Sequence, residues 1–95
     1  MKLEWAPEAL HDLVEVHAYI ARDNPDAATK VVRRIVTFVA ERLTDMPEIG
    51  RPGRHPGTRE LFIPRTPFIV PYRVTADQVS VLRVYHSARL WPDSL

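Results

Sequence analysis

Apolar residues recur at helical spacing between Pro7 and about residue 22, which predicts an amphipathic helix there. Pro7 suits the first turn, where its missing N–H costs nothing, and the helix should end near Arg22–Asp23. The predicted apolar stripe consists of Leu10, Leu13, Val14, His17, Ile20 and Ala21. The acidic residues Glu8, Asp12 and Glu15 fall opposite it, so we expect them to form a solvated row.

A second helix is predicted from "NPDAA" onward, with Asn24 as its cap and Pro25 at its first position. "DMPEIG" ends it, because Met46 precedes Pro47 and is pushed out of helical angles. Its apolar stripe is Ala28, Val31, Val32, Ile35, Val36, Val39 and Leu43. The short turn between the two helices predicts an antiparallel hairpin.

The other segments alternate or are rich in β-branched and aromatic residues, which predicts strands. These segments are Lys2–Trp5, Arg59–Ile63, Phe68–Val74 and Val79–Tyr85, with "TADQ" as a tight turn and "GRPGRHPG" as loop. Pro71 cannot donate to a ladder, so a bulge or an unpaired edge is expected at that point. The pattern predicts one α+β domain over residues 1–95, in the order β-α-α-β-β-β, with the helical hairpin packed on a small, mainly antiparallel sheet.

Composition supports an ordinary globular chain, since 45% of the residues are hydrophobic and 26% are charged. The chain has no cysteine, and "MKLEWAPEAL" lacks the apolar core of a signal peptide. Ile35–Ala40 is too short to span a membrane. We therefore expect a cytoplasmic protein without a membrane partner.

Charge is divided unevenly along the chain. Residues 1–48 carry six Lys/Arg and nine Asp/Glu, whereas residues 49–95 carry seven Arg and three acids, so charges of −3 and +4 give the net +1. Arginine matches carboxylates and phosphates with a rigid fork, which favours an anionic partner. An arginine-preferring genome explains the same bias, because the whole chain has 11 Arg and two Lys.

Metal and cofactor chemistry find little support in the sequence. His11 and His17 do not share a helix face, while His55 and His86 lack neighbouring ligands, so no metal site is predicted. His17 is instead expected to be a buried or half-buried core residue. No glycine loop follows a strand to hold phosphate, and no motif surrounds Ser80 or Ser87. No cofactor is expected.

The remaining candidates are basic residues near the predicted strands: Arg51, Arg54, Arg59, Arg73, Arg83, His86 and Arg89. An RNA-cleaving site would need arginines to neutralise phosphate and a group such as His to move a proton. A protein-docking surface would need only arginines and nearby aromatics such as Trp91. Solvated strand edges are a third interpretation.

The chain resembles toxins of the RelE/ParE superfamily, which belong to bacterial type II toxin–antitoxin modules. The resemblance covers nearly the whole length and is carried by "APEALHDLVEVHAYIARDNPDAA", "LTDMPEIGRPGR" with "GTREL", and "FIVPYRV…VSVLRVYHSARLWP". It implies the same strand, hairpin and sheet. It also implies an antitoxin that wraps the toxin, is encoded beside it and forms a hetero-oligomer with it.

The superfamily divides by target, because RelE-like members cut mRNA in the ribosome and ParE-like members poison DNA gyrase without cutting RNA. Ile69 stands where the nuclease pattern places an arginine, and the long hairpin resembles the ParE branch; His86, however, matches a histidine of one nuclease subgroup. The resemblance therefore favours a growth-inhibiting, ParE-like toxin that is not an enzyme. The alternatives are a metal-independent, ribosome-dependent mRNA endoribonuclease and a small non-toxic nucleic-acid-binding module.

Each alternative assigns its own residues. In the nuclease interpretation, His86, Arg83 and Arg73 are catalytic. In the binding interpretation, target or antitoxin is held by Arg51, Arg54, Arg59, Arg83, Arg89 and Trp91.

Overall fold

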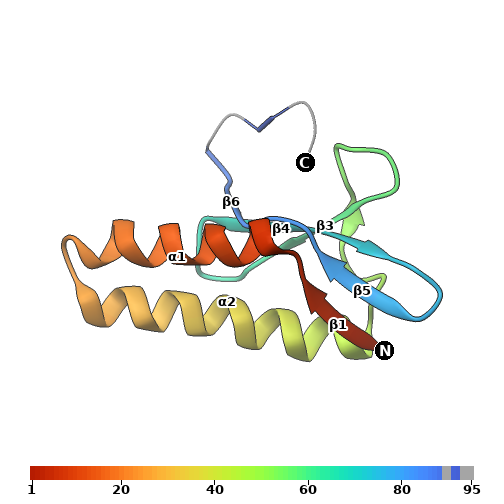
Figure 1. The fold of residues 1–95 in the computed structure, drawn as a ribbon, viewed down its shortest axis with the longest axis horizontal. Coiled ribbons are helices and arrows are strands. Elements are labelled where there is room, and N and C mark those ends of the chain that lie inside the picture. Colours follow the sequence, from red (N-terminus) through yellow and green to blue (C-terminus); the bar gives the residue numbers. More distant parts are fainter. Residues whose placement is uncertain (89–90, 93–95) are drawn as a thin grey trace.

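The computed structural model describes residues 1–88 and 91–92. Its elements, in chain order, are β1 (Lys2–Trp5), α1 (Pro7–Ala21), α2 (Pro25–Asp45), β2 (Arg51–Pro52), β3 (Arg59–Phe62), β4 (Phe68–Val74), β5 (Gln78–Val81) and β6 (Tyr85–His86). The α+β class and the helical hairpin are confirmed (Figure 1). Within the described part of the chain, neither helix is long and apolar enough to cross a membrane.

The helix ends have the chemistry that the sequence predicts. Asn24 is extended, and its Oδ1 accepts a hydrogen bond of 3.0 Å from the Ala27 N–H, one of the unpaired donors of a helix start. Met46 leaves the helical region with φ −132° and ψ 74°, directly before Pro47. The Thr75 N–H donates to the Gln78 carbonyl at 2.9 Å, which closes the predicted "TADQ" turn.

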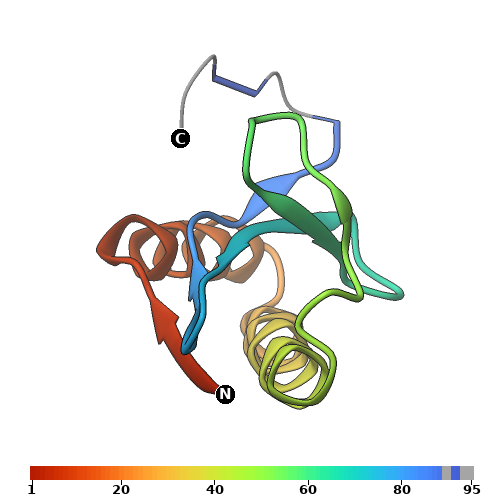
Figure 2. The same ribbon diagram turned by 90° about the vertical axis from the view of Figure 1, so that its right-hand side faces the viewer.

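The sheet has the order β1-β5-β4-β3-β2, with β6 also on β4, and only the β1–β5 pair is parallel among the described strands. Both helices cover one side of it (Figure 2). Along β4, Phe68, Val70 and Tyr72 join the core with the helices. Side chains alternate along a strand, so the residues between them face the other side, which we call the open face.

The buried face of α1 differs from the predicted stripe. Leu10 and Val14 are 50% and 66% exposed, and His17 is exposed, so the expectation of a core histidine is wrong. Asp12 is only 6% exposed, so its assignment to a solvated row is also wrong. The helix packs on the sheet through Ala9, Leu13 and Val16 and turns Asp12 toward the segment after β5.

The bulge expected at Pro71 is present, but the extra residue lies in the neighbouring segment, residues 82–84, and not in β4. Ile69 pairs with Tyr85 and Tyr72 with Val81, so β4 has two residues (70–71) where its neighbour has three (82–84). Pro71 has no N–H to donate, and its carbonyl accepts from the Leu82 N–H at 2.9 Å. The predicted strand 79–85 is therefore broken into β5 and β6, and the extra residue lets residues 83–84 turn toward α1.

Tyr72 fixes the start of the arginine-rich loop from inside the core. Its side chain is fully buried, and its hydroxyl accepts a 2.8 Å hydrogen bond from the Gly50 N–H. A Cβ at position 50 would lie 2.6 Å from this hydroxyl and 2.8 Å from the Glu60 carbonyl oxygen, so only glycine fits there. Burial raises the pKa of Tyr72 above its ordinary value of 10.0, although the Gly50 N–H and the charge of Arg59 oppose the shift.

This raised pKa predicts a loss of stability at alkaline pH. The unfolded chain releases the Tyr72 proton at a lower pH than the folded chain, so the contribution is complete below pH 10.0 and is lost as pH rises through the folded pKa. We expect the free energy of unfolding, measured by urea denaturation, to fall less steeply with pH in Tyr72→Phe. Equal slopes in both proteins would contradict this assignment.

Candidate functional site

Glu60 organises the first group of arginines. The Glu60 side chain is 2% exposed and accepts 3.1 Å and 2.8 Å hydrogen bonds from Arg51 Nη2 and the Arg54 backbone N–H. Arg54 Nε lies 3.7 Å from the same carboxylate. Arg51 pairs with Glu60 across β2 and β3, and Glu60 with Pro71, so this group lies on the open face. The buried carboxylate is compensated by two partly exposed guanidinium groups.

Asp12 of α1 holds Arg83, a second candidate arginine, in the segment between β5 and β6. Its carboxylate accepts hydrogen bonds from Arg83 Nε at 2.8 Å, Arg83 Nη2 at 3.0 Å and the Val84 N–H at 2.9 Å. This paired geometry is the strongest form of an arginine–carboxylate contact. The hydrogen bonds that Arg83 donates to Asp12 raise the pKa of Arg83 above its ordinary value, against the effect of burial. Arg83 is thus neutralised within the chain.

Two aromatic rings link these groups across the open face. Arg83 lies 4.8 Å from the Tyr85 ring centre, Tyr85 lies 4.7 Å from Trp91, and Trp91 lies 3.7 Å from the Arg54 guanidinium carbon. Cation–π contacts of this kind hold a guanidinium in one orientation. The stack joins α1 to the loop after β2, through residues from four separate parts of the sequence.

The other predicted arginines have different surroundings. Arg73 is exposed on the open face, and a Cβ at Gly57 would come within 3.8 Å of its Nε, so it lies beside the loop that carries Arg54. Arg59 pairs with Tyr72 on the helix side, and its Nη1 donates to the carbonyls of Glu48 and Gly50 at 3.2 and 2.8 Å. Arg89 lies outside the described residues.

His86 lies on the helix side of the sheet, opposite to Arg73. It pairs with Phe68, and the two rings meet edge to face with 5.6 Å between their centres. Its Nδ1 accepts a 3.1 Å hydrogen bond from the Ala88 N–H. His86 and Arg73 therefore lie on opposite faces of the sheet, whereas Arg83 is bound to Asp12 of α1.

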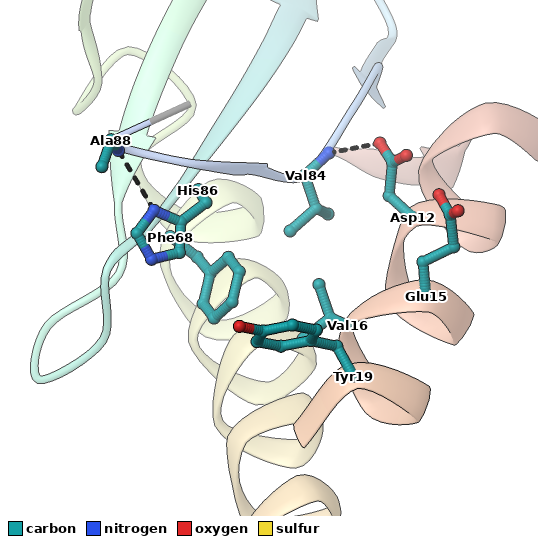
Figure 3. A pocket seen from close by; sticks show the side chains of 8 residues that line it. All are labelled: Asp12, Glu15, Val16, Tyr19, Phe68, Val84, His86 and Ala88. Carbon is teal, nitrogen blue, oxygen red and sulfur yellow. Dashed lines mark hydrogen bonds between the residues drawn. The ribbon is translucent and has the colours of Figure 1, made fainter. Parts of the chain in front are cut away.

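Figure 3 shows His86 at one wall of a pocket between α1 and the sheet. The pocket measures about 590 Å³ and is lined by Asp12, Glu15, Val16, Tyr19, Phe68, Val84, His86 and Ala88. Its walls are mainly apolar. The Asp12 carboxylate and His86 Nδ1 both accept hydrogen bonds from backbone N–H groups beside the pocket, which gives these two polar groups a structural use.

His11, Asp12 and Glu15 could offer metal ligands, since their candidate atoms lie within 4.8 Å of one another. Both Asp12 oxygens already accept hydrogen bonds from Arg83, and one also from Val84. His11 and Glu15 are exposed and face each other at 3.5 Å, as a surface pair one helical turn apart. A metal ion would have to displace Arg83 from Asp12.

Sequence patterns alone missed the two buried carboxylates. The position of Glu60 could have indicated its role, because it is the only acidic residue in the sequence between Glu48 and Asp77, an arginine-rich segment. No local pattern indicates the role of Asp12, since its partner Arg83 lies 71 residues away and reaches it through the break between β5 and β6. The sequence predicts Tyr85 as a strand residue, whereas its contact with the Trp91 ring depends on the fold of the segment after β6.

Proteins similar to this chain over most of its length are described as toxins. The family model described as "ParE toxin of type II toxin-antitoxin system, parDE" matches residues 3–91. The toxin candidate Y4kP of Sinorhizobium fredii is 46% identical over 99% of this chain and 96% of its own length. Toxin RelE2 of Caulobacter vibrioides is 33% identical over 90% of this chain and 94% of its own.

Among solved structures, the chain is similar to one from the "Chromosomal ParDE TA system from P. aeruginosa". The TM-score is 0.82 and the identity 34%, and the match covers 90% of this chain and 95% of the other. This chain and that structure are therefore similar both in fold and in sequence. The chain belongs to the ParE toxin family of type II toxin–antitoxin systems, within the RelE/ParE superfamily.

Proposed function

We propose that this toxin arrests growth by binding DNA gyrase, that it does not cut RNA, and that a cognate antitoxin encoded beside it neutralises it. The main support is the placement of His86 and Arg73 on opposite faces of the sheet, together with the binding of Arg83 to Asp12. Catalysis by general acid and base requires a proton-transferring group within reach of the groups that neutralise phosphate. His86 faces α1, whereas Arg73 faces the open side of the sheet.

Two further observations favour binding over cleavage. Arg83 uses Nε and Nη2 for Asp12, so a phosphate would have to compete with a carboxylate already in ideal geometry. Ile69, at the position of the nuclease arginine, is 3% exposed and pairs with Tyr85. It supplies packing at a point where cleavage would need positive charge.

The antitoxin is proposed from the similar solved structure, which is named as a ParDE toxin–antitoxin system. An acidic and amphipathic antitoxin segment would suit the exposed arginines and the exposed apolar residues of the hairpin, Leu10 and Val14. This partnership places the toxin's activity under the control of the antitoxin's supply.

Expression in a bacterial host without the antitoxin tests this function. We expect viable counts to fall, the DNA-damage response to rise, and transcripts to remain intact by sequencing of RNA 5′ ends. Co-expressed antitoxin should restore growth, and His86→Ala should stay as toxic as the unchanged protein. New transcript ends together with harmless His86→Ala would establish the endoribonuclease alternative, and harmless expression of the unchanged protein would refute both toxin mechanisms.

A further inference from the structure

The open face carries an excess of exposed positive charge. The Arg51 and Arg54 side chains are 62% and 46% exposed, Arg73 is exposed, and Glu60 is the one carboxylate among the described residues that pairs with them. These three arginines and one glutamate give a local charge of +2. Within the described residues, Arg73 has no carboxylate partner within ion-pair distance. This surface can therefore bind further anionic groups.

An apolar residue accompanies these arginines. Phe62 is 55% exposed, and it lies on the open face because it pairs with Ile69, two residues along from the Glu60–Pro71 pair. Arg54 is held on Trp91, so less side-chain freedom is lost when it binds a partner. Exposed aromatic and arginine side chains on a rigid support are typical of the residues that dominate binding energy in protein interfaces.

We propose that Arg51, Arg54, Arg73 and Phe62 form the surface that binds the toxin's protein target, through carboxylates on that target placed around an apolar contact. This inference rests on the proposed function and names the surface it uses. The main argument for this surface is charge complementarity. Its three arginines outnumber the one glutamate that pairs with them, and guanidinium groups match carboxylates in geometry.

The surroundings favour a protein over a nucleic acid. The aromatic stack connects this basic patch to α1, where Asp12 binds Arg83 and Glu8 lies near enough to help raise the pKa of Arg83. A long polyanion crossing the sheet would approach this acidic helix, whereas a discrete acidic protein surface would not. The Trp91 ring is already in contact with Tyr85 and Arg54, which limits its use for stacking on bases.

The test compares two variants with the same change of charge. Arg73→Glu with Arg51→Gln alters the open face and leaves Arg54 on Glu60; Arg34→Glu with Arg33→Gln alters exposed positions of α2. Binding to purified gyrase is measured by surface plasmon resonance, and folding by circular dichroism. We expect the open-face variant to bind at least about tenfold more weakly and the α2 variant to bind as the unchanged protein does.

The outcomes separate this inference from the proposed function. Equal binding by the folded open-face variant would overturn the inference and leave gyrase as the target. Failure of the unchanged protein to bind gyrase would refute the proposed function and the inference with it. Tight binding of a labelled single-stranded RNA that is lost in the open-face variant would instead assign the surface to nucleic acid.

Discussion

Replacing Asp12 by alanine is expected to lower the free energy of unfolding by about 3–5 kcal/mol, the usual cost of removing one partner from a buried ion pair. The change leaves Arg83 without its two carboxylate contacts and the buried Val84 N–H without an acceptor. It also weakens the joint between α1 and the segment after β5. Urea denaturation followed by circular dichroism measures the change.

The matched control is Glu15→Ala, on the same helix but with a side chain that is 65% exposed, and it should change stability by less than about 0.5 kcal/mol. Asp12→Asn keeps an acceptor for Val84 and should fall between the two. In the double variant with Arg83→Ala, the loss should be smaller than the sum of the single losses, because the two changes break the same contact. Similar stabilities for Asp12→Ala and Glu15→Ala would show that the Asp12–Arg83 ion pair does not stabilise the fold.

The second large effect is expected at Glu60. Glu60→Ala should lower the free energy of unfolding by about 1.5–3 kcal/mol, since hydrogen bonds to a charged group are lost and the Arg54 N–H loses its acceptor. The loss should be smaller than at Asp12, because Arg51 and Arg54 are partly exposed and water replaces the carboxylate. Denaturation against Glu48→Ala, an exposed neighbouring glutamate, measures it.

The same change should loosen the loop between β2 and β3. Of its contacts with the described residues, the Arg54 side chain would then keep the one with Trp91. Amide hydrogen exchange should therefore quicken over residues 51–58 while the α2 amides keep their protection. Unchanged exchange in this loop would mean that Glu60 does not organise the open face.

Local patterns predicted both helices and the strands β1, β3 and β4, because the causes of these elements are local, whereas β2 lies in a segment predicted as loop. Pro7, Asn24 and Pro47 act on neighbouring backbone, and the β-branched and aromatic content of β4 is visible in seven consecutive residues. The face that α1 buries was misjudged because Leu10 and Val14 are as apolar as Leu13, and only contact with the sheet distinguishes them. A helix with more apolar residues than its contact face can hold leaves some exposed.

The site was less predictable, since it depends on contacts between distant residues. The sequence showed many arginines but not their compensation, which comes from Asp12 and Glu60. The register break beside Pro71 also decides which residues face each side, and it places His86 beside Phe68 rather than beside Arg73. A one-residue shift moves a side chain to the other face of a sheet, so uniform alternation through residues 79–85 could not locate the histidine.

Supercoiling by purified gyrase in the presence of the purified toxin is the most direct test of its proposed mechanism. We predict that the toxin blocks supercoiling of relaxed plasmid, that prior addition of antitoxin prevents the block, and that His86→Ala blocks as strongly as the unchanged protein. Undisturbed supercoiling, together with cleavage of mRNA on ribosomes that requires His86, would contradict it.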